Sequence, residues 1–208
     1  MITLKFCRPS QNPTRKELQK KALSFSHIPY EKNEPYLKNI LNMGSLTAAA
    51  QSLAALESLD FLLTEECVLK RNADGRPYAA NLPHVDFSLS HSGELSVCAL
   101  ACGEEYVPRI GVDIEKEYEK DPDKLVFRFF SEGEKNYYSL SEDKKKAFTL
   151  LWTRKEAFLK YTGEGLSAAL SSFDVTSPLG VRFETLYTDG HTVTVCAEDI
   201  QFPIRIQK

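Results

Sequence analysis

The sequence predicts an α+β protein of two similar lobes that form an intramolecular pseudodimer, each a small antiparallel sheet packed with helices. Three observations lead to this prediction. The 208 residues are 42% hydrophobic and 11% aromatic, enough for a packed core in one moderate domain or in two halves. Strand-like alternation of apolar residues occurs in both halves of the chain. In each half it is combined with apolar residues spaced three and four apart, as on one face of a helix.

The first lobe is expected over residues 1–105. Its helix is indicated by leucines and alanines at helical spacing, and its hairpin by alternating residues on either side of a Ser-Gly-Glu turn. The expected elements are a strand over 2–7, a basic stretch over 15–21, a helix over about 44–67, a turn at 72–75, and a hairpin over 85–101.

The second lobe is expected over residues 106–208. Ser131 and Glu134 have the spacing of a capping box, in which a serine and a glutamate bond reciprocally to the start of a helix. The expected elements are a strand over 110–115, helices over 122–140 and 142–161, and strands near Val175, over 181–186, 192–197 and 204–206.

Bulk charge and cysteine usage exclude several classes of protein. A net charge of −3 argues against a protein that coats nucleic acid. The five cysteines form no Cys-x-x-Cys pair, which argues against a zinc site, and free thiols indicate a reducing compartment. The N-terminus does not resemble a signal peptide, and no apolar run is long enough to span a bilayer. We therefore expect a cytoplasmic protein with no membrane partner.

Two carboxylates mark the strand over 110–115. Asp113 and Glu115 alternate with Val112 and Ile114, so both acids lie on the face opposite the apolar one, roughly 7 Å apart. Carboxylates this close repel each other and shift each other's pKa unless a cation lies between them. The pair therefore indicates a cation site.

A third carboxylate follows in the helix Trp152-Thr153-Arg154-Lys155-Glu156-Ala157-Phe158-Leu159-Lys160. Glu156 and Lys160 are four residues apart and share a face, whereas Lys155 projects about 100° away. One interpretation is an ordinary surface Glu–Lys pair. The other places Glu156 with the two strand acids around Mg²⁺, which binds carboxylates and substrate phosphates.

A serine and a histidine meet at the corner of the expected hairpin. Ser90 and His91 could simply be a water-facing hydroxyl and a turn residue, or they could offer a hydroxyl and an imidazole to an anion. A nucleophile–base pair is disfavoured because adjacent strand residues point to opposite faces. The segments at 75–77 and 163–166 have the glycines of turns and helix ends but lack the spacing of phosphate-binding loops.

Together these segments resemble the 4′-phosphopantetheinyl transferases, specifically the monomeric surfactin-synthetase-activating type. The resemblance covers roughly residues 70 to 176, and its pieces occur in the family's order and spacing. The matching segments are Gly75–Pro77, Phe87–Ser92, Gly111–Glu115, Arg128–Ser131 with Glu134, Trp152–Lys160, Gly163–Ser167 and Ser172–Val175.

The resemblance implies transfer of the phosphopantetheine arm of coenzyme A to a serine of an apo acyl or peptidyl carrier protein. It assigns Asp113, Glu115 and Glu156 to Mg²⁺, or Mn²⁺, on the pyrophosphate, with Glu156 also as general base. The same resemblance gives the remaining residues to coenzyme A: Lys155 and Lys160 to the phosphates, Ser90 and His91 to the 3′-phosphate region, and Arg76 to the adenine end.

The N-terminal part departs from the family pattern. Gln51 and Ser52 stand where a basic residue and a threonine are typical, with Lys38 the basic residue ahead of them. Arg71 or Lys70 could compensate. Two alternatives remain beside the transferase: a catalytically degenerate member that binds coenzyme A or carrier without transfer, and a metal-dependent phosphoesterase that shares only the three acids.

Overall fold

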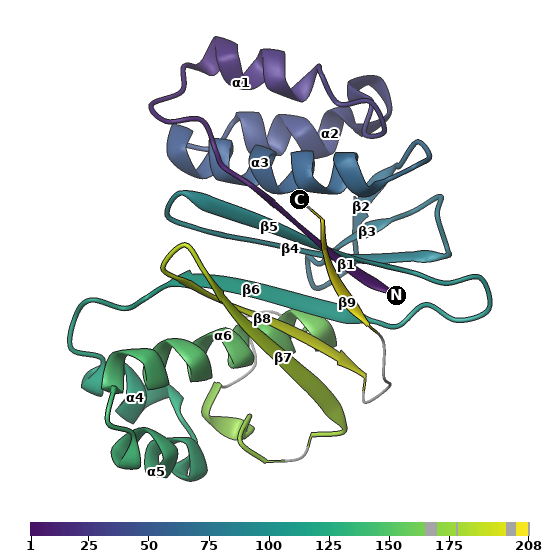
Figure 1. Ribbon diagram of the computed structural model, residues 1–208. Helices are drawn as coiled ribbons and strands as arrows, with labels where there is room; N and C mark the ends of the chain where they lie inside the picture. Colours follow the sequence, from purple (N-terminus) through teal and green to yellow (C-terminus); the bar gives the residue numbers. More distant parts are fainter. Residues whose placement is uncertain (165–169, 178, 199–202, 208) are drawn as a thin grey trace.

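The computed structural model describes residues 1–164, 170–177, 179–198 and 203–207 and has mixed helices and strands (Figure 1). The helices are α1 (Arg15–Ala22), α2 (Tyr30–Leu41), α3 (Leu46–Leu62), α4 (Asp123–Phe129), α5 (Glu132–Leu140), α6 (Lys144–Thr162) and the 3₁₀ turn η2 (Leu170–Ser172). The strands are β1 (Ile2–Cys7), β2 (Leu69–Arg71), β3 (Pro77–Ala79), β4 (Val85–Ser92), β5 (Leu95–Cys102), β6 (Ile110–Lys116), β7 (Val181–Thr188), β8 (His191–Glu198) and β9 (Ile204–Gln207).

A layer of three helices covers one face of the four-stranded sheet β4-β5-β1-β9 (Figure 1). Helix α3 packs directly on the strands, and α1 and α2 lie against it. The core of this layer joins apolar side chains of all three helices to Phe87, Cys98 and Leu100 of the sheet. Ser45 caps α3 by accepting a hydrogen bond from Ala48 N, which places the helix start just ahead of its apolar residues.

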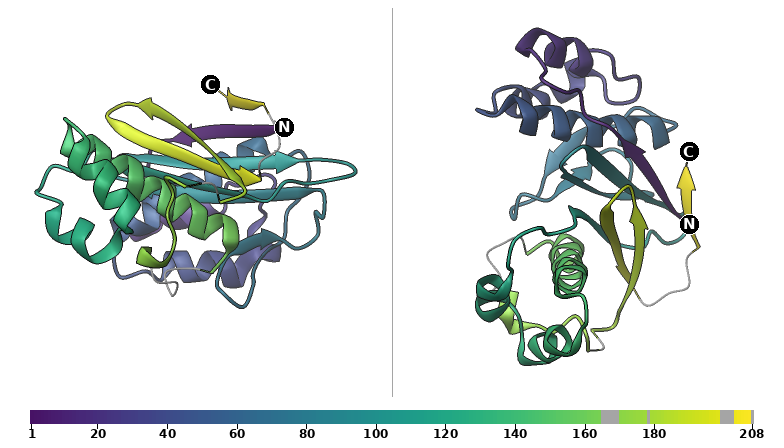
Figure 2. Two further views of the ribbon diagram at one scale, coloured as in Figure 1. Left: turned by 90° about the horizontal axis from the view of Figure 1, so that it is seen from below. Right: turned by 60° about the vertical axis from the view of Figure 1, so that its left-hand side comes forward.

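The second sheet has the order β6-β8-β7, and α6 lies against β6 and β8 (Figure 2). Helices α4 and α5 flank α6 and share with it a core that includes Phe130, Phe148 and Leu151. The predicted capping box is confirmed: Ser131 and Glu134 bond reciprocally at the start of α5. Gly163, with φ of 81°, ends α6 in the left-handed conformation that glycine favours.

A third core lies between the two sheets. Leu95, Val97, Ala99 and Ala101 of β5 meet apolar residues of β6 and β8, while Cys98 and Leu100 point back to the helices. Strand β5 is therefore buried on both faces, which explains why its residues are apolar almost without interruption. This inter-sheet core brings β4 and β6 side by side.

The predicted α+β class and most elements are confirmed, but the structure differs at several points. Helix α1 and the short strands β2 and β3 were not predicted, and the helical segment expected over 122–140 is divided into α4 and α5. Strand β9 lies in the first sheet, where it pairs in parallel with β1, so that sheet is not purely antiparallel and the chain's tail leaves the second lobe. Val175 is not in a strand but is buried against α4–α6. Helix α2 was not predicted. The division at 105/106 and the pseudodimer relation of the lobes stay predictions.

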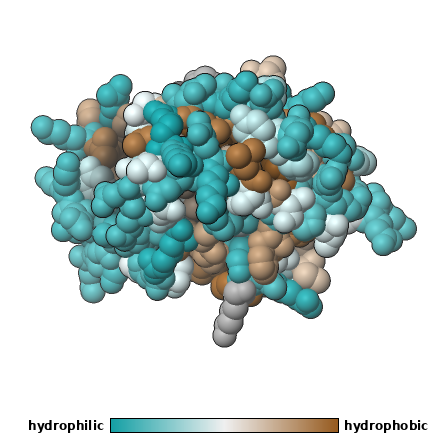
Figure 3. Space-filling view, turned by 90° about the horizontal axis from the view of Figure 1, so that it is seen from above, coloured by the Kyte–Doolittle hydropathy of each residue, from teal (hydrophilic) through white to brown (hydrophobic). Residues whose placement is uncertain are grey.

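No helix among the described residues is long and apolar enough to cross a bilayer. Seen from the α1 side, the surface is largely hydrophilic with small separate hydrophobic areas (Figure 3). All five cysteines are free thiols. The motif residues 165–167 lie outside the described residues.

Candidate functional site

The two strand acids lie under α6, where β6 runs beside β4. Gly111 makes this possible, because a Cβ there would lie 2.0 Å from the Ala157 carbonyl oxygen of the helix. The acids occupy the predicted face of β6, opposite Val112 and Ile114. That face is covered rather than open, since Asp113 is only 4% exposed. A covered acid pair needs polar partners or a cation.

Asp113 has an ion pair on one carboxylate oxygen and nothing on the other. Its Oδ1 accepts from Lys160 Nζ at 2.7 Å and from Ser90 Oγ at 2.7 Å. Its Oδ2 is buried and has no hydrogen-bond partner among the described residues. A buried carboxylate oxygen without a partner costs free energy unless another ligand supplies positive charge.

Burial and the charge of Asp113 disfavour ionisation of the other two acids. Burial and the charge of Asp113 raise the pKa of Glu115 to about 7, although Ser92, which donates to its Oε2 at 2.7 Å, and Lys160 oppose this shift. Burial and Asp113 also raise the pKa of Glu156, against the opposing charge of Lys160. One lysine therefore faces three carboxylates, and the site has a deficit of positive charge.

The carboxylate oxygens of these three acids are suitable ligands for a divalent cation. The site has three carboxylates whose charges interact, and one of them has a free buried oxygen. Within the described part of the chain, however, no three His, Cys, Asp or Glu side chains are gathered closely enough to form a ready metal cage. Asp113, Glu115 and Glu156 are the residues that could hold such an ion once their side chains close on it.

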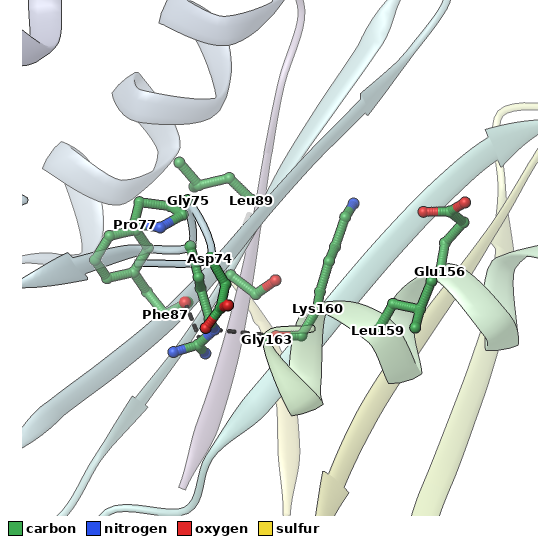
Figure 4. Close-up of a pocket in the computed structure, with 11 residues that line it drawn as sticks. Asp74, Gly75, Pro77, Phe87, Leu89, Glu156, Leu159, Lys160 and Gly163 are labelled. Atoms are coloured by element: carbon green, nitrogen blue, oxygen red, sulfur yellow. Dashed lines mark hydrogen bonds between the residues drawn. The ribbon is translucent and has the colours of Figure 1, made fainter. Parts of the chain in front are cut away.

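Two of the cavities that adjoin the acids also reach Lys160. One, of about 300 Å³, is lined by Gly75, Pro77, Phe87, Glu156 and Lys160. Figure 4 shows the side chains of Glu156 and Lys160 extending from α6 in the same direction, as their four-residue spacing predicts. The second cavity, of about 380 Å³, lies beside the α2–α3 layer and also reaches Asp113 and Lys160.

Three basic side chains line that second cavity: Lys160, His91 and Arg71. His91 is exposed, and partial desolvation together with the charge of Lys160 lowers its pKa. Arg71 lies over the ring of Tyr36, 4.8 Å from its centroid, and donates to the Gly75 carbonyl at 2.7 Å. Of the two basic residues considered as substitutes for the missing helix cations, Arg71 is thus the one beside the cavity.

Lys155 is buried and lines neither of these cavities, so its placement does not support its assignment to the phosphates, which stays a prediction. Its side chain is 0% exposed and pairs with Glu134 at 2.7 Å. It also donates to the Phe173 carbonyl at 2.9 Å and lies over the Phe173 ring. Glu134 in turn accepts from Val175 N at 2.9 Å. Lys155 therefore joins α6 to α5 and to the segment after η2, a structural role.

Arg76 lies at the seam of the lobes. Its guanidinium forms a bidentate pair with Asp86, at 3.0 and 2.8 Å, and donates to the carbonyl oxygens of Ile110 and Lys160. Arg76 is also among the residues that line the first cavity. Its contact with the adenine end stays a prediction.

Ser90 is placed differently from its predicted role. Its hydroxyl accepts from Lys160 Nζ at 2.8 Å and Ile114 N at 3.4 Å while it donates to Asp113. A hydroxyl has one donor and two acceptor sites, so this one is fully used within the protein. Ser90 thus holds Asp113 and Lys160 together, and its hydroxyl is not free for the 3′-phosphate region.

The chain is similar in sequence to proteins of one known family. Residues 109–206 match the model of the 4′-phosphopantetheinyl transferase superfamily. The resemblance predicted from the motifs is confirmed. The chain is similar to "4′-phosphopantetheinyl transferase Sfp" of Bacillus subtilis strain 168, with 35% identity over 62% of this chain and 62% of that protein.

Further 4′-phosphopantetheinyl transferases match a shorter part of the chain. One from Bacillus subtilis is 37% identical over 56% of this chain and 50% of its own length, and the protein ffp is 42% identical over 57% and 51%. The chain therefore spans about half to three fifths of the length of these three relatives. A solved holo-[acyl-carrier-protein] synthase of Thermotoga maritima covers 44% of this chain and 63% of that chain at 19% identity and a TM-score of 0.38, too weak a likeness to support an argument.

Proposed function

We propose that this chain transfers the 4′-phosphopantetheine arm of coenzyme A to a serine hydroxyl of an acyl or peptidyl carrier protein. The observation that supports it best is the cluster of Asp113, Glu115 and Glu156 beside Lys160, at a cavity between the lobes. The resemblance to 4′-phosphopantetheinyl transferases over residues 109–206 includes all four residues. In this reaction a serine–phosphate bond forms, and the bond to adenosine 3′,5′-bisphosphate breaks.

The four residues have distinct parts in this proposal. Asp113, Glu115 and Glu156 would hold Mg²⁺ or Mn²⁺, which when bound stabilises charge on the pyrophosphate oxygens. Lys160 adds a second positive charge at the phosphates. A carboxylate beside a divalent cation stays ionised, so Glu156 would be able to accept the proton of the carrier serine.

Coenzyme A would lie across both cavities. Arg71 lines the cavity on the α2–α3 side and supplies positive charge there, and His91 offers a hydrogen-bonding imidazole. Gln51 does not replace the missing cation, because its side chain donates to the Gly93 carbonyl at 2.7 Å and supports the hairpin turn. The cytoplasmic location and the monomeric state implied by the family resemblance belong to the same proposal.

Intact-protein mass spectrometry tests this function directly. The chain is incubated with Mg²⁺, coenzyme A and a panel of apo carriers, and a mass gain equal to the phosphopantetheine arm is expected on at least one carrier. Glu156→Gln should lower the transfer rate by about 10²-fold or more, as for loss of a general base. Glu142→Gln, an exposed acid just ahead of α6, is the matched control and should transfer normally.

Two other outcomes would contradict the proposal. Binding of carriers without any mass gain, with either metal, indicates the degenerate family member. Loss of coenzyme A in a reaction without carrier indicates a phosphoesterase. Full activity of Glu156→Gln would remove Glu156 from its assigned role while leaving the transfer itself intact.

A further inference from the structure

The two sheets lie side by side along their edge strands, and these two strands are not paired with each other by backbone hydrogen bonds. Strand β4 is the edge of the first sheet, and β6 is the edge of the second. Strand β6 pairs antiparallel with β8 over its whole length, and in such a pair only every second residue directs its N–H to the partner strand, so the alternate N–H groups of β6 point toward β4. Buried N–H groups on such an edge need acceptors.

Side chains of β4 supply these acceptors at a constant register. Every second residue of β4 accepts a hydrogen bond from every second N–H of β6, and each pair is 24 residues apart. The four bonds are Ile110 N to Asp86 Oδ2 at 2.9 Å, Val112 N to Ser88 Oγ at 3.0 Å, Ile114 N to Ser90 Oγ at 3.4 Å and Lys116 N to Ser92 Oγ at 3.2 Å. We call these four side chains the seam ladder.

Two members of the seam ladder also hold the acids of the site. Ser92 accepts from the N–H of Lys116 and donates to the preceding residue, Glu115, at 2.7 Å. Ser90 bridges Ile114 N and Asp113 in the same way. Each of these hydroxyl oxygens accepts a hydrogen bond from a backbone N–H, which restricts the directions in which its own O–H can point. The carboxylate that accepts from this O–H is therefore held in one orientation.

Ser88 makes the same ladder bond without the second contact. The residue preceding its partner Val112 is Gly111, which has no side chain to hold. Ser88 and Ser92 can therefore be compared as a matched pair. Both join the two strands, but only Ser92 also orients an acid. Ser90 is less suited to such a comparison because Lys160 also bonds to it.

The end of the ladder is itself held by two other elements. The His191 ring nitrogen Nε2 of β8 lies 3.1 Å from the carbonyl oxygen of Ser92. Gln51 of α3 bonds to the next carbonyl, at Gly93. The hairpin turn that begins at Ser92 is therefore bonded both to the second sheet and to the helical layer, which limits the movement of Ser92.

We propose that Ser92 is a positioning residue that orients the Glu115 carboxylate for the metal on coenzyme A. The inference rests on the proposed function and adds to it a residue that does not touch the substrate. Glu115 uses Oε2 for the Ser92 bond, and no bond to its Oε1 occurs among the described residues. Fixing one oxygen in this way presents the other to a ligand. Loss of such a supporting bond typically weakens metal binding about 10- to 100-fold.

The test measures Mn²⁺ binding directly, by the electron paramagnetic resonance signal of free Mn²⁺ in the presence of coenzyme A and absence of carrier. Ser92→Ala should raise the Mn²⁺ dissociation constant about 10-fold or more. Ser92→Thr, which keeps a hydroxyl, should restore it toward the wild-type value. Ser88→Ala should bind Mn²⁺ as the wild type does. Both alanine variants should lower Tm by a similar amount, about 2–4 °C.

Three results separate the alternatives. Equal weakening of Mn²⁺ binding in Ser88→Ala and Ser92→Ala would show that the ladder acts only on the fold and would overturn the positioning role. Unchanged binding in Ser92→Ala, in a preparation whose wild type transfers the arm, would overturn it while leaving the proposed function standing. A wild type that neither binds Mn²⁺ nor modifies any carrier contradicts the proposed function, and the role of Ser92 with it.

Discussion

Lys155 lies inside the motif that led to the functional prediction, yet it serves the fold. The pair with Glu134 is fully buried, and burial lowers the pKa of the lysine. Removing one partner of such a pair leaves an uncompensated buried charge, so Lys155→Met should lower the free energy of unfolding by about 3–5 kcal/mol. Urea denaturation measures this, with the exposed Lys145→Met as the matched control, expected within about 0.5 kcal/mol of wild type.

A phosphate-binding role for Lys155 would give a different result. In that case the variant would keep its stability and show a raised KM for coenzyme A. Our structural interpretation instead requires that Lys155→Met and Lys145→Met, compared at a temperature where both are folded, have similar KM values.

Arg71 was one of two residues that, on the sequence alone, could compensate for the missing basic residue of the first long helix. It lies over Tyr36 at the cavity that also contains His91 and Lys160. Removal of one charge-assisted bond to a phosphate costs about 1.5–3 kcal/mol, so Arg71→Gln should raise KM for coenzyme A roughly 10- to 100-fold with little change in kcat. Its exposed neighbour on β2, Lys70, provides the control: Lys70→Gln should leave KM nearly unchanged, and equal effects of the two variants would contradict a specific contact.

At the scale of elements, the contact between α6 and β6 sets the distance between Glu156 and the strand acids. Gly111 is the point of closest approach, with a Cβ placed 2.0 Å from Ala157 O and 2.6 Å from Tyr161 N. Because both neighbours are backbone atoms, Gly111→Ala should force α6 away and destabilise the protein by about 1–3 kcal/mol or more.

Two measurements check this prediction. Thermal denaturation should show the lowered Tm, and any folded fraction should transfer the arm more slowly because Glu156 and Lys160 move with α6. Gly44→Ala is the control, since nothing lies within 4 Å of a Cβ there. A Gly111→Ala protein with wild-type stability would mean that helix and strand do not pack as closely as described.

Helix α2 shows where element prediction failed. It contains Pro35, which cannot donate a backbone hydrogen bond and normally argues against a helix interior. Tertiary packing outweighs this effect, because Tyr36, Leu37, Ile40 and Leu41 are buried against the neighbouring helices. The strong local signals, by contrast, were interpreted correctly: the Ser131 capping box, the hairpin turn with Gly93 and the left-handed Gly163 all occur as predicted.

At the scale of the whole molecule, the site draws residues from both sheets, so a ligand bound there should stabilise their association. Mg²⁺ together with coenzyme A should therefore raise Tm. A ligand at 100 times its Kd contributes about 2.7 kcal/mol, which corresponds to a rise of several degrees for a chain of this size. Differential scanning fluorimetry with and without a chelator measures the effect. Glu156→Gln should show a smaller metal-dependent rise, and a Tm independent of both ligands would contradict the site.

Local periodicity and residue chemistry were enough to predict the α+β class and most strands and helices, and they indicated the three acids and Lys160 as candidates for the site. The tertiary structure alone decided which motif residues face the cavity. Lys155 and Glu156 are adjacent in sequence, but one enters a core and the other the site, since neighbouring helical residues point about 100° apart. It also decided the seam ladder and the return of β9 to the first sheet, because these pair residues far apart in the chain and leave no local signal.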